Sequence, residues 1–210
     1  LLSCSVGGMI ALLGFTSIPV ASAATSTTTL ADQPVFAGTG IPGNLALVLS
    51  VEFPTAISVA NLGDYADAST YLGYFAPLKC YDYTFVPSSA GDGSASYFQP
   101  ASFAAGTYKH SCSGQWSGNF MNWATMQTID PFRWALSGGY RSVDTATTTI
   151  LEKAWGSNQG SLTNFPDRGT SQTAGGGSNL PATLVAQVTP FTWTNFNLSI
   201  WGNGNRMVFS

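Results

Sequence analysis

The stretch Cys112-Ser-Gly-Gln-Trp-Ser-Gly-Asn-Phe-Met-Asn-Trp-Ala-Thr-Met-Gln-Thr-Ile-Asp130 decides how this chain folds. It carries two tryptophans and two methionines, and it contains no lysine, arginine or glutamate. Leaving so many large apolar side chains in water is unfavourable, so we expect the stretch to be buried. Ser117 precedes the apolar run, and a serine there is typical of the residue that caps a helix. The stretch therefore predicts a buried helix that begins after Ser117.

A second helix is expected directly after this stretch. Asp130-Pro131 joins a carboxylate, which caps a helix well, to a proline, which favours the first helical position. The helix should run over Pro131–Ser137 and stop at Gly138-Gly139, because glycine adopts the left-handed conformation that ends many helices. The tryptophans at helical positions are all expected in the core: Trp116, Trp123 and Trp134.

Three further segments indicate an α/β fold. Residues 45–53, Leu-Ala-Leu-Val-Leu-Ser-Val-Glu-Phe, are nearly all apolar and are followed by Pro54, which predicts a strand buried on both faces. Residues 145–155 place apolar side chains on one helical face and predict a third helix. Partial alternation over residues 184–210, with a glycine–asparagine turn at Gly202–Asn205, predicts a β-hairpin.

The first part of the chain has the pattern of a signal peptide. An apolar core is followed by Ala21-Ser-Ala23, the small-x-small pattern that precedes cleavage, so residues 1–23 are expected to be removed. The apolar run is shorter than the roughly 20 residues that a membrane span needs, so no span is expected in the mature chain. The chain opens on Leu1 without a basic segment, which suggests a signal peptide truncated at its start.

The remaining chain divides into two parts. Residues 24–43 are rich in threonine, serine and glycine and are expected to form a flexible lead. Residues 44–210 are expected to form one domain with a long insertion at 61–111, because that insertion is rich in tyrosine, serine and glycine and has only short apolar runs. The sequence stops inside a strand-like run, which suggests that the domain is incomplete at its C-terminus.

Two cysteines remain after removal of the signal peptide. Cys80 and Cys112 form an even pair in a chain expected to reach an oxidising compartment, which favours a disulfide between them. Two free buried thiols are the alternative interpretation. A zinc site is disfavoured, because His110 is the only histidine and no Cys-x-x-Cys spacing occurs.

Composition argues against two large classes of function. Charged residues make up 8% of the chain, against about 25% in an average domain, and the net charge is -3. No basic patch of the kind that binds nucleic acid is visible. No Gly-x-Ser-x-Gly motif surrounds a serine, and we expect no catalytic residues and no enzyme activity. A hydrolase that uses His110 is the third-ranked alternative.

The stretch quoted at the start resembles the N-terminal region of the PilC/PilY family of type IV pilus-tip adhesins and biogenesis proteins. Further stretches resemble the same family, in the same order along the chain, and together they cover most of the mature sequence. These are residues 45–54, Tyr65–Phe75 with Cys80-Tyr81, Ile129–Arg141 and Thr149–Trp155.

The resemblance implies a fold and a function. The fold would be a von Willebrand factor A-like sheet flanked by helices, with the long loop and strand insertion and the C-terminal β-hairpin. The family's calcium-binding β-propeller would lie beyond Ser210, so no cofactor is expected in this fragment. The implied work is pilus assembly and surface adhesion, with pilus tip subunits (minor pilins) and host or abiotic surfaces as partners. The implied location is exported: the periplasm, the outer membrane surface or the pilus tip.

Type A domains commonly hold a divalent cation through Asp-x-Ser-x-Ser after the first strand, where hard oxygen ligands suit Mg²⁺. Here that place reads Ser50-Val-Glu52-Phe-Pro54, so the aspartate is missing and no metal site is expected. Ser50 and Glu52 are the only weak candidates for oxygen ligands there. Asp92-Gly-Ser-Ala-Ser96 fits the motif by letter but follows a turn instead of a buried strand, and we interpret it as a solvated turn.

Tyrosines in the insertion are the candidates for surface contacts, because tyrosine offers a large contact area at low entropic cost. The leading hypothesis is a non-catalytic domain that contacts proteins or host surfaces. The alternative is a carbohydrate-binding module that uses the same tyrosine-rich insertion. The candidate residues are Tyr65, Tyr71, Tyr74, Tyr81 and Tyr83.

Overall fold

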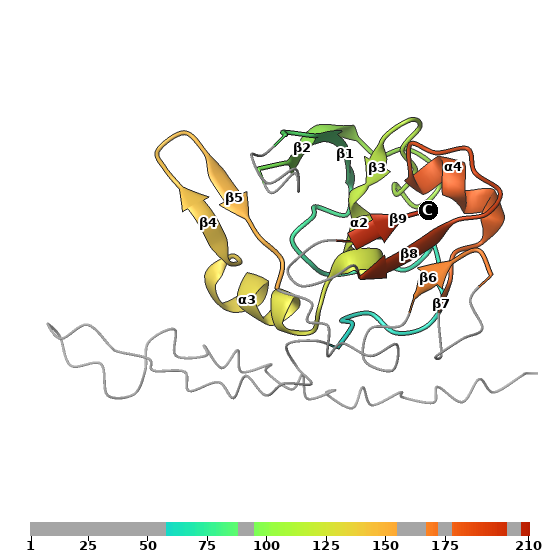
Figure 1. Cartoon of the computed structure of the whole chain (residues 1–210), viewed down its shortest axis with the longest axis horizontal. Helices are drawn as coiled ribbons and strands as arrows, with labels where there is room; N and C mark the ends of the chain where they lie inside the picture. The colour runs from blue at the N-terminus through green and yellow to red at the C-terminus, as the bar shows by residue number, and fades with distance from the viewer. Residues whose placement is uncertain (1–57, 88–94, 155–166, 172–177, 201–206) are drawn as a thin grey trace, which may run out of the picture. The chain divides into compact units, whose positions relative to one another are not determined.

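The computed structural model describes residues 58–87, 95–154, 167–171, 178–200 and 207–210 (Figure 1). The strand expected at residues 45–53 and the signal peptide lie outside these residues. The described helices are α2 (Gly118–Thr125), α3 (Ile129–Ser137), the 3₁₀ turn η2 (Ala182–Leu184) and α4 (Val185–Val188).

The described strands form three small sheets. The first is antiparallel in the order β2-β1-β3, from β1 (Lys79–Thr84), β2 (Tyr97–Phe103) and β3 (Trp116–Ser117). The second is the hairpin of β4 (Arg141–Asp144) and β5 (Thr149–Leu151). The third has the order β7-β6-β8-β9, from β6 (Arg168–Gly169), β7 (Ser178–Asn179), β8 (Asn197–Ile200) and β9 (Met207–Phe209).

This arrangement is a small α/β domain with mixed sheets. Within the described residues, β6 and β7 are the single parallel pair, and the other pairings are antiparallel. The α/β class is therefore confirmed, whereas these residues do not establish a type A-like sheet. The C-terminal hairpin is confirmed, because β8 and β9 pair through Leu198 with Phe209 and Ile200 with Met207.

Helix α2 is buried along its whole length and forms the centre of the core. It begins as the sequence predicts, because the Ser117 hydroxyl accepts a hydrogen bond from the Phe120 backbone N–H at 3.4 Å. Phe120 and Trp123 are fully buried and pack against other aromatic rings in edge-to-face and tilted arrangements, which add to the stabilisation from burial alone. Trp116 lies in the same cluster, so two of the three tryptophans expected in the core are there.

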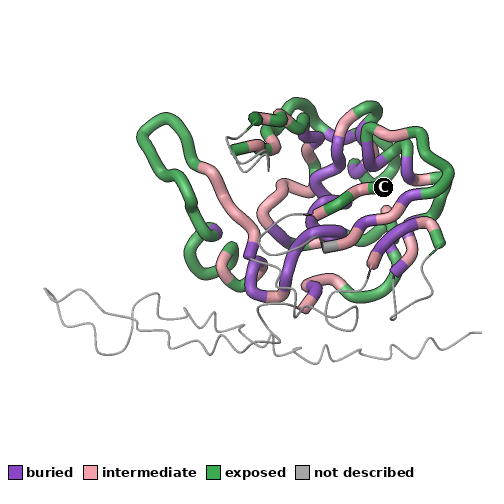
Figure 2. The backbone as a smooth tube through the Cα atoms, in the orientation of Figure 1, coloured by how far each residue is buried: buried purple, intermediate pink, exposed green. Residues whose placement is uncertain are grey.

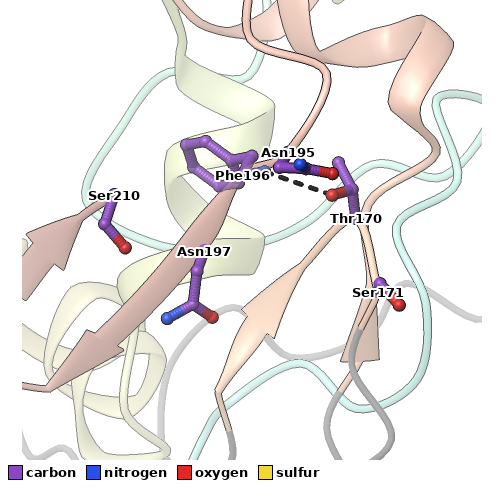
Figure 3. A pocket seen from close by; sticks show the side chains of 6 residues that line it. All are labelled: Thr170, Ser171, Asn195, Phe196, Asn197 and Ser210. Carbon is purple, nitrogen blue, oxygen red and sulfur yellow. Dashed lines mark hydrogen bonds between the residues drawn. The ribbon is translucent and has the colours of Figure 1, made fainter.

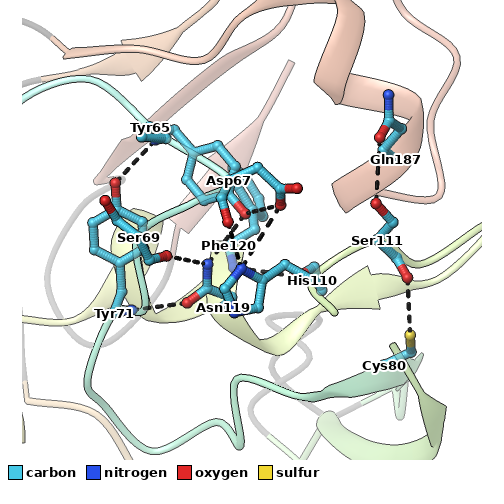
Figure 4. A network of polar contacts seen from close by, with 12 residues as sticks. Tyr65, Asp67, Ser69, Tyr71, Cys80, His110, Ser111, Asn119, Phe120 and Gln187 are labelled. Carbon is cyan, nitrogen blue, oxygen red and sulfur yellow. Dashed lines mark hydrogen bonds and ion pairs between the residues drawn. The ribbon is translucent and has the colours of Figure 1, made fainter. Parts of the chain in front are cut away.

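Two asparagines on α2 fasten the preceding loop to the core, and Figure 4 shows the first of them, Asn119. Asn119 accepts a hydrogen bond from the Tyr71 N–H at 2.8 Å and donates to the Ser69 carbonyl at 2.9 Å. Asn122 accepts from the Phe75 N–H at 3.0 Å and donates to the Tyr71 and Phe75 carbonyls at 2.9 and 2.8 Å. The two amides thus supply the partners that an irregular backbone segment needs when it is buried against a helix.

Close approach of this loop requires glycine at two places. A Cβ at Gly73 would lie 2.3 Å from Asn122 Oδ1, and a Cβ at Gly118 would lie 2.2 Å from the Ala76 carbonyl oxygen. Any side chain at either position would push the loop away from α2. The tryptophan–serine–glycine–asparagine order of the opening stretch therefore has a packing reason.

The disulfide expected from the sequence is present, between Cys80 on β1 and Cys112 before β3. Both cysteines are buried, and the bond between them rules out the alternative of two free thiols. The Cys112 N–H donates to the Gln187 carbonyl at 2.6 Å, and Figure 4 shows Ser111 bridging Cys80 and Gln187. The cross-link thus ties the first sheet to α4 as well as closing a loop.

The expected cap of α3 is wrong. The N-cap is Thr128, without a side-chain cap bond, and Asp130 lies inside the first turn. The Asp130 carboxylate is fully buried and accepts from the Gln127 N–H at 3.0 Å and the Ala154 N–H at 2.8 Å. Asp130 therefore joins the chain before α3 to the chain after β5. The predicted stop is confirmed, since Gly138 has a left-handed φ of 78°.

The third helix expected at residues 145–155 is wrong, because β4 and β5 form a hairpin there. The β-branched residues that fill the segment favour strands over helices. The Thr145 hydroxyl also accepts hydrogen bonds from the N–H groups of Thr147 and Thr148 at 3.4 and 3.0 Å, which stabilises the turn.

A half-buried lysine, Lys153, completes the junction between α3 and the hairpin. Lys153 Nζ donates to the Gln127 side-chain oxygen and to the Ala154 carbonyl, each at 2.8 Å. Burial of the ammonium group lowers the pKa of Lys153 to about 8, although the nearby Asp130 charge opposes this shift. Burial also raises the pKa of Asp130, whose backbone hydrogen bonds act in the other direction.

Replacing Asn122 with alanine should destabilise the domain strongly. The change removes three hydrogen bonds and leaves backbone groups of Tyr71 and Phe75 without partners at a buried site, so we expect a loss of about 3 kcal/mol or more. Chemical denaturation measures this value. Asn195→Ala is the matched control, because Asn195 is exposed, and it should change stability by less than about 0.5 kcal/mol. Equal stability of the two variants would contradict the fastening role of Asn122.

The pKa of Lys153 predicts a pH dependence. Between about pH 8 and 10.5 the unfolded chain binds more protons at this lysine than the folded chain, so the free energy of unfolding should rise with pH there. Relative to Lys153→Met, wild type should gain about 2 kcal/mol between pH 7 and about 9.5. Denaturation curves across this range measure the gain, with Lys109→Met as the control at an exposed lysine. Parallel profiles for wild type and Lys153→Met would refute the prediction.

Candidate interaction surface

Two of the five tyrosines expected at a contact surface are instead part of the core. Tyr65 and Tyr81 are buried, and burial raises the pKa of each hydroxyl. The Tyr65 hydroxyl contacts Asp67 Oδ1 at 3.4 Å, and the Tyr81 hydroxyl accepts from the Ala76 N–H at 2.8 Å. The expectation was wrong for these two, because their hydroxyls satisfy polar groups of the packed loop.

The other three tyrosines differ from one another in exposure. Tyr71 and Tyr74 are half-buried, and both bond to backbone: Tyr71 accepts from the Ala66 N–H at 3.0 Å, and Tyr74 accepts from the Tyr140 N–H at 3.2 Å. Tyr83 alone of the five is largely exposed, at 48%. The structure therefore does not bring the five together as one contact surface.

The residues considered for metal binding or catalysis either lie outside the described residues or are buried in the domain. Ser50 and Glu52 lie outside the described residues, as does most of the Asp92–Ser96 motif. His110 is buried, with Nδ1 2.6 Å from the Asp67 carbonyl oxygen (Figure 4). The described residues contain no group of three or more His, Cys, Asp or Glu side chains that is placed to hold a metal ion.

One set of exposed apolar side chains lies on residues 129–151, which we call the arm. The arm consists of α3 and the β4–β5 hairpin, which extend away from the sheets around α2 (Figure 1). Figure 2 shows most of its length as exposed. Its exposed apolar residues are Phe132 (52%), Trp134 (44%), Leu136 (50%), Tyr140 (51%) and Val143 (38%).

The arm is well anchored although its surface is open. Asp130 and Lys153 hold its two ends together, as described above. Gly139 packs so closely that a Cβ would lie 3.1 Å from Leu151 and from the Tyr74 ring, and its φ of 104° suits glycine. Exposed apolar surface of this kind often marks a site of interaction with another molecule.

The chemistry of the arm is that of protein interfaces. Aromatic residues and arginine are enriched at interfaces, whereas lysine, glutamate and aspartate are depleted. The Arg133 guanidinium lies 5.5 Å from the centre of the Tyr140 ring, and Arg141 pairs with Asp144 at 3.2 Å. The arm thus offers aromatic and aliphatic anchors beside fixed positive groups.

Sequence reasoning missed this surface because it assigned Trp134 to the core. One signal was available: Phe132 and Leu136 share a helical face, whereas Trp134 points to the opposite side. A helix that is apolar on two sides cannot bury both against one domain unless it is fully enclosed.

Within the described ranges, no helix combines the length and the apolar character that crossing a bilayer requires.

Comparison with known proteins places the chain in a family. A family model described as the PilY1 homolog small alpha/beta domain matches residues 63–173. A type IV pilus biogenesis factor PilY1 homolog of Xylella fastidiosa strain Temecula1 is 39% identical over 206 residues, which is 96% of this chain and 16% of that protein. A second protein of the same description and organism is 37% identical over 97 residues, covering 46% of this chain and 6% of that protein. No solved structure matches.

The matched residues include the disulfide, α2 and the arm, so the features described above lie inside the family's own domain. The chain spans 16% of the length of the first of these two relatives. The resemblance to the PilC/PilY family is confirmed, and this chain belongs to the PilY1 homolog family.

Proposed function

We propose that this chain is a non-catalytic contact domain that acts in type IV pilus assembly and surface adhesion. The relatives named as type IV pilus biogenesis factors support the pilus-related role. The single observation that carries the proposal is the exposed arm, because its apolar side chains project from a firmly held element of the family's domain.

The partner that best fits the arm is another pilus protein, and we propose the minor pilins of the pilus tip. Phe132 and Leu136, which share one face of α3, would fill an apolar groove, and Arg133 would meet carboxylates or carbonyl groups at its rim. An α-helix that lays apolar anchors into a groove is a common mode of recognition. Contact with host or abiotic surfaces would follow from the same exposed chemistry.

Export is part of the proposal. The buried Cys80–Cys112 disulfide supports it, since such bonds persist in oxidising compartments. The domain would then work in the periplasm, at the outer membrane surface or at the pilus tip. We also propose a von Willebrand factor A-like architecture for the longer domain, supported by its α/β class and by the family resemblance.

The tyrosine-rich insertion does not favour the alternative of a carbohydrate-binding module. A sugar platform requires open ring faces, whereas Tyr65 and Tyr81 are enclosed in the core. Their rings contact Phe120, Trp123 and Phe75 instead. These two rings are therefore not available as a platform for a sugar.

The double variant Phe132→Ser and Leu136→Ser should weaken binding to purified minor pilins. Central aromatic and aliphatic anchors each contribute about 1–2 kcal/mol, so the dissociation constant should rise at least roughly tenfold. Because both side chains are largely exposed, stability should change by less than about 1 kcal/mol. Surface plasmon resonance and thermal denaturation measure the two effects.

Tyr97→Ser with Phe103→Ser is the matched control, because these exposed aromatic residues lie on β2, outside the arm. It should leave pilin binding unchanged. If both double variants bound minor pilins like the wild type, the arm would not be the contact site. Loss of binding in the β2 variant alone would move the contact to the first sheet.

A further inference from the structure

A shallow pocket lies at the third sheet, away from the arm's residues (Figure 3). Its volume is about 340 Å³, near the lower end of the range for small-ligand sites. Three separate segments contribute to it: the residues after β6, the start of β8 and the end of β9. The lining residues are Thr170, Ser171, Asn195, Phe196, Asn197 and Ser210.

Backbone hydrogen bonds hold these segments in register. The Thr170 N–H donates to the Phe196 carbonyl at 2.9 Å, and the Phe196 N–H donates back to the Thr170 hydroxyl at 3.1 Å. Asn197 and Ser210 exchange backbone hydrogen bonds at 2.6 and 2.8 Å. The pocket is therefore formed before a ligand arrives, which lowers the entropic cost of binding.

The chemistry of the lining selects for an uncharged, hydroxyl-rich ligand. Apart from Phe196, the described residues that line it have hydroxyl or amide side chains, which both donate and accept hydrogen bonds and carry no charge. The Asn195 side chain is exposed and makes no hydrogen bond to other described residues. A charged ligand would find no counter-ion here, whereas sugar hydroxyls match both kinds of group.

Two stacked aromatic rings lie next to Phe196, one of the lining residues. Trp193 stacks flat on Phe191, with ring centres 3.9 Å apart and planes 4° from parallel. Its ring centre lies 6.4 Å from that of Phe196, which lines the pocket, and 39% of Trp193 is exposed. An indole that is held rigid on one side and open to solvent suits the apolar C–H face of a sugar ring.

We propose that this pocket, with Trp193 at its side, binds a neutral saccharide of one or two hexose units. Asn195, Ser171 and Thr170 would bond the sugar hydroxyls, and Trp193 would cover a C–H face. The site lies outside the tyrosine-rich insertion and shares no residue with the arm. It would add glycan recognition to the protein contacts proposed above, without depending on them.

Saturation-transfer NMR on the full chain tests this proposal. The ligands are glucose, galactose, mannose and N-acetylglucosamine. Glucuronate, a charged sugar, and glycerol, a small polyol, are the two control compounds. At least one neutral hexose should bind saturably with a dissociation constant on the order of millimolar, and glucuronate and glycerol should not. No saturable signal from any neutral hexose up to about 100 mM would overturn the proposal.

Three variants locate the binding. Asn195→Ala and Trp193→Ala should each weaken it at least roughly tenfold while thermal denaturation stays close to wild type. Tyr83→Ala, at the exposed tyrosine of the insertion, should not change it. Binding that survives Asn195→Ala and Trp193→Ala, or that is lost with Tyr83→Ala, would overturn this assignment. The arm double variant should bind sugar normally, which separates failure of this site from failure of the pilin contact.

Discussion

Everything in the described part of this domain depends on burying a helix that is not purely apolar. Helix α2 is enclosed on all sides, yet it carries Asn119 and Asn122, whose amides would be unfavourable in a core without partners. Both find partners in the backbone of residues 69–75, so the helix and the loop satisfy each other. Neither could be buried alone, and this mutual requirement specifies how the loop lies.

Buried charge follows the same rule elsewhere in the domain. The Arg168 guanidinium is enclosed, donates to the Trp123 and Asn61 carbonyls, and lies 4.3 Å from the centre of the Trp123 ring. Burial lowers the pKa of Arg168 to about 9. At the base of the arm, Asp130 and Lys153 are likewise held by backbone groups. These ionisable side chains therefore join segments that are distant in sequence.

The low proportion of charged residues, 8% of the chain, bears on the proposed function. A domain with few surface charges recognises partners mainly by shape, aromatic contact and neutral hydrogen bonds. The arm and the third-sheet pocket represent these two modes: one projects large apolar side chains, and the other is concave and lined by hydroxyls and amides. Because the arm and the pocket share no residue, the proposed protein partner and the proposed glycan would not compete for the same side chains.

Local chemistry was enough to predict several features from the sequence. Ser117 caps α2, Gly138 ends α3, Cys80 pairs with Cys112, and the last residues form a hairpin, because each depends on neighbours in the chain or on compartment. The exposure of Trp134, the burial of Tyr65 and Tyr81, the bridging role of Asp130 and the hairpin at residues 141–151 did not follow in this way. Each is settled by which distant segment supplies a hydrogen-bond partner or a covering surface, and a single sequence carries no direct record of such long-range contacts.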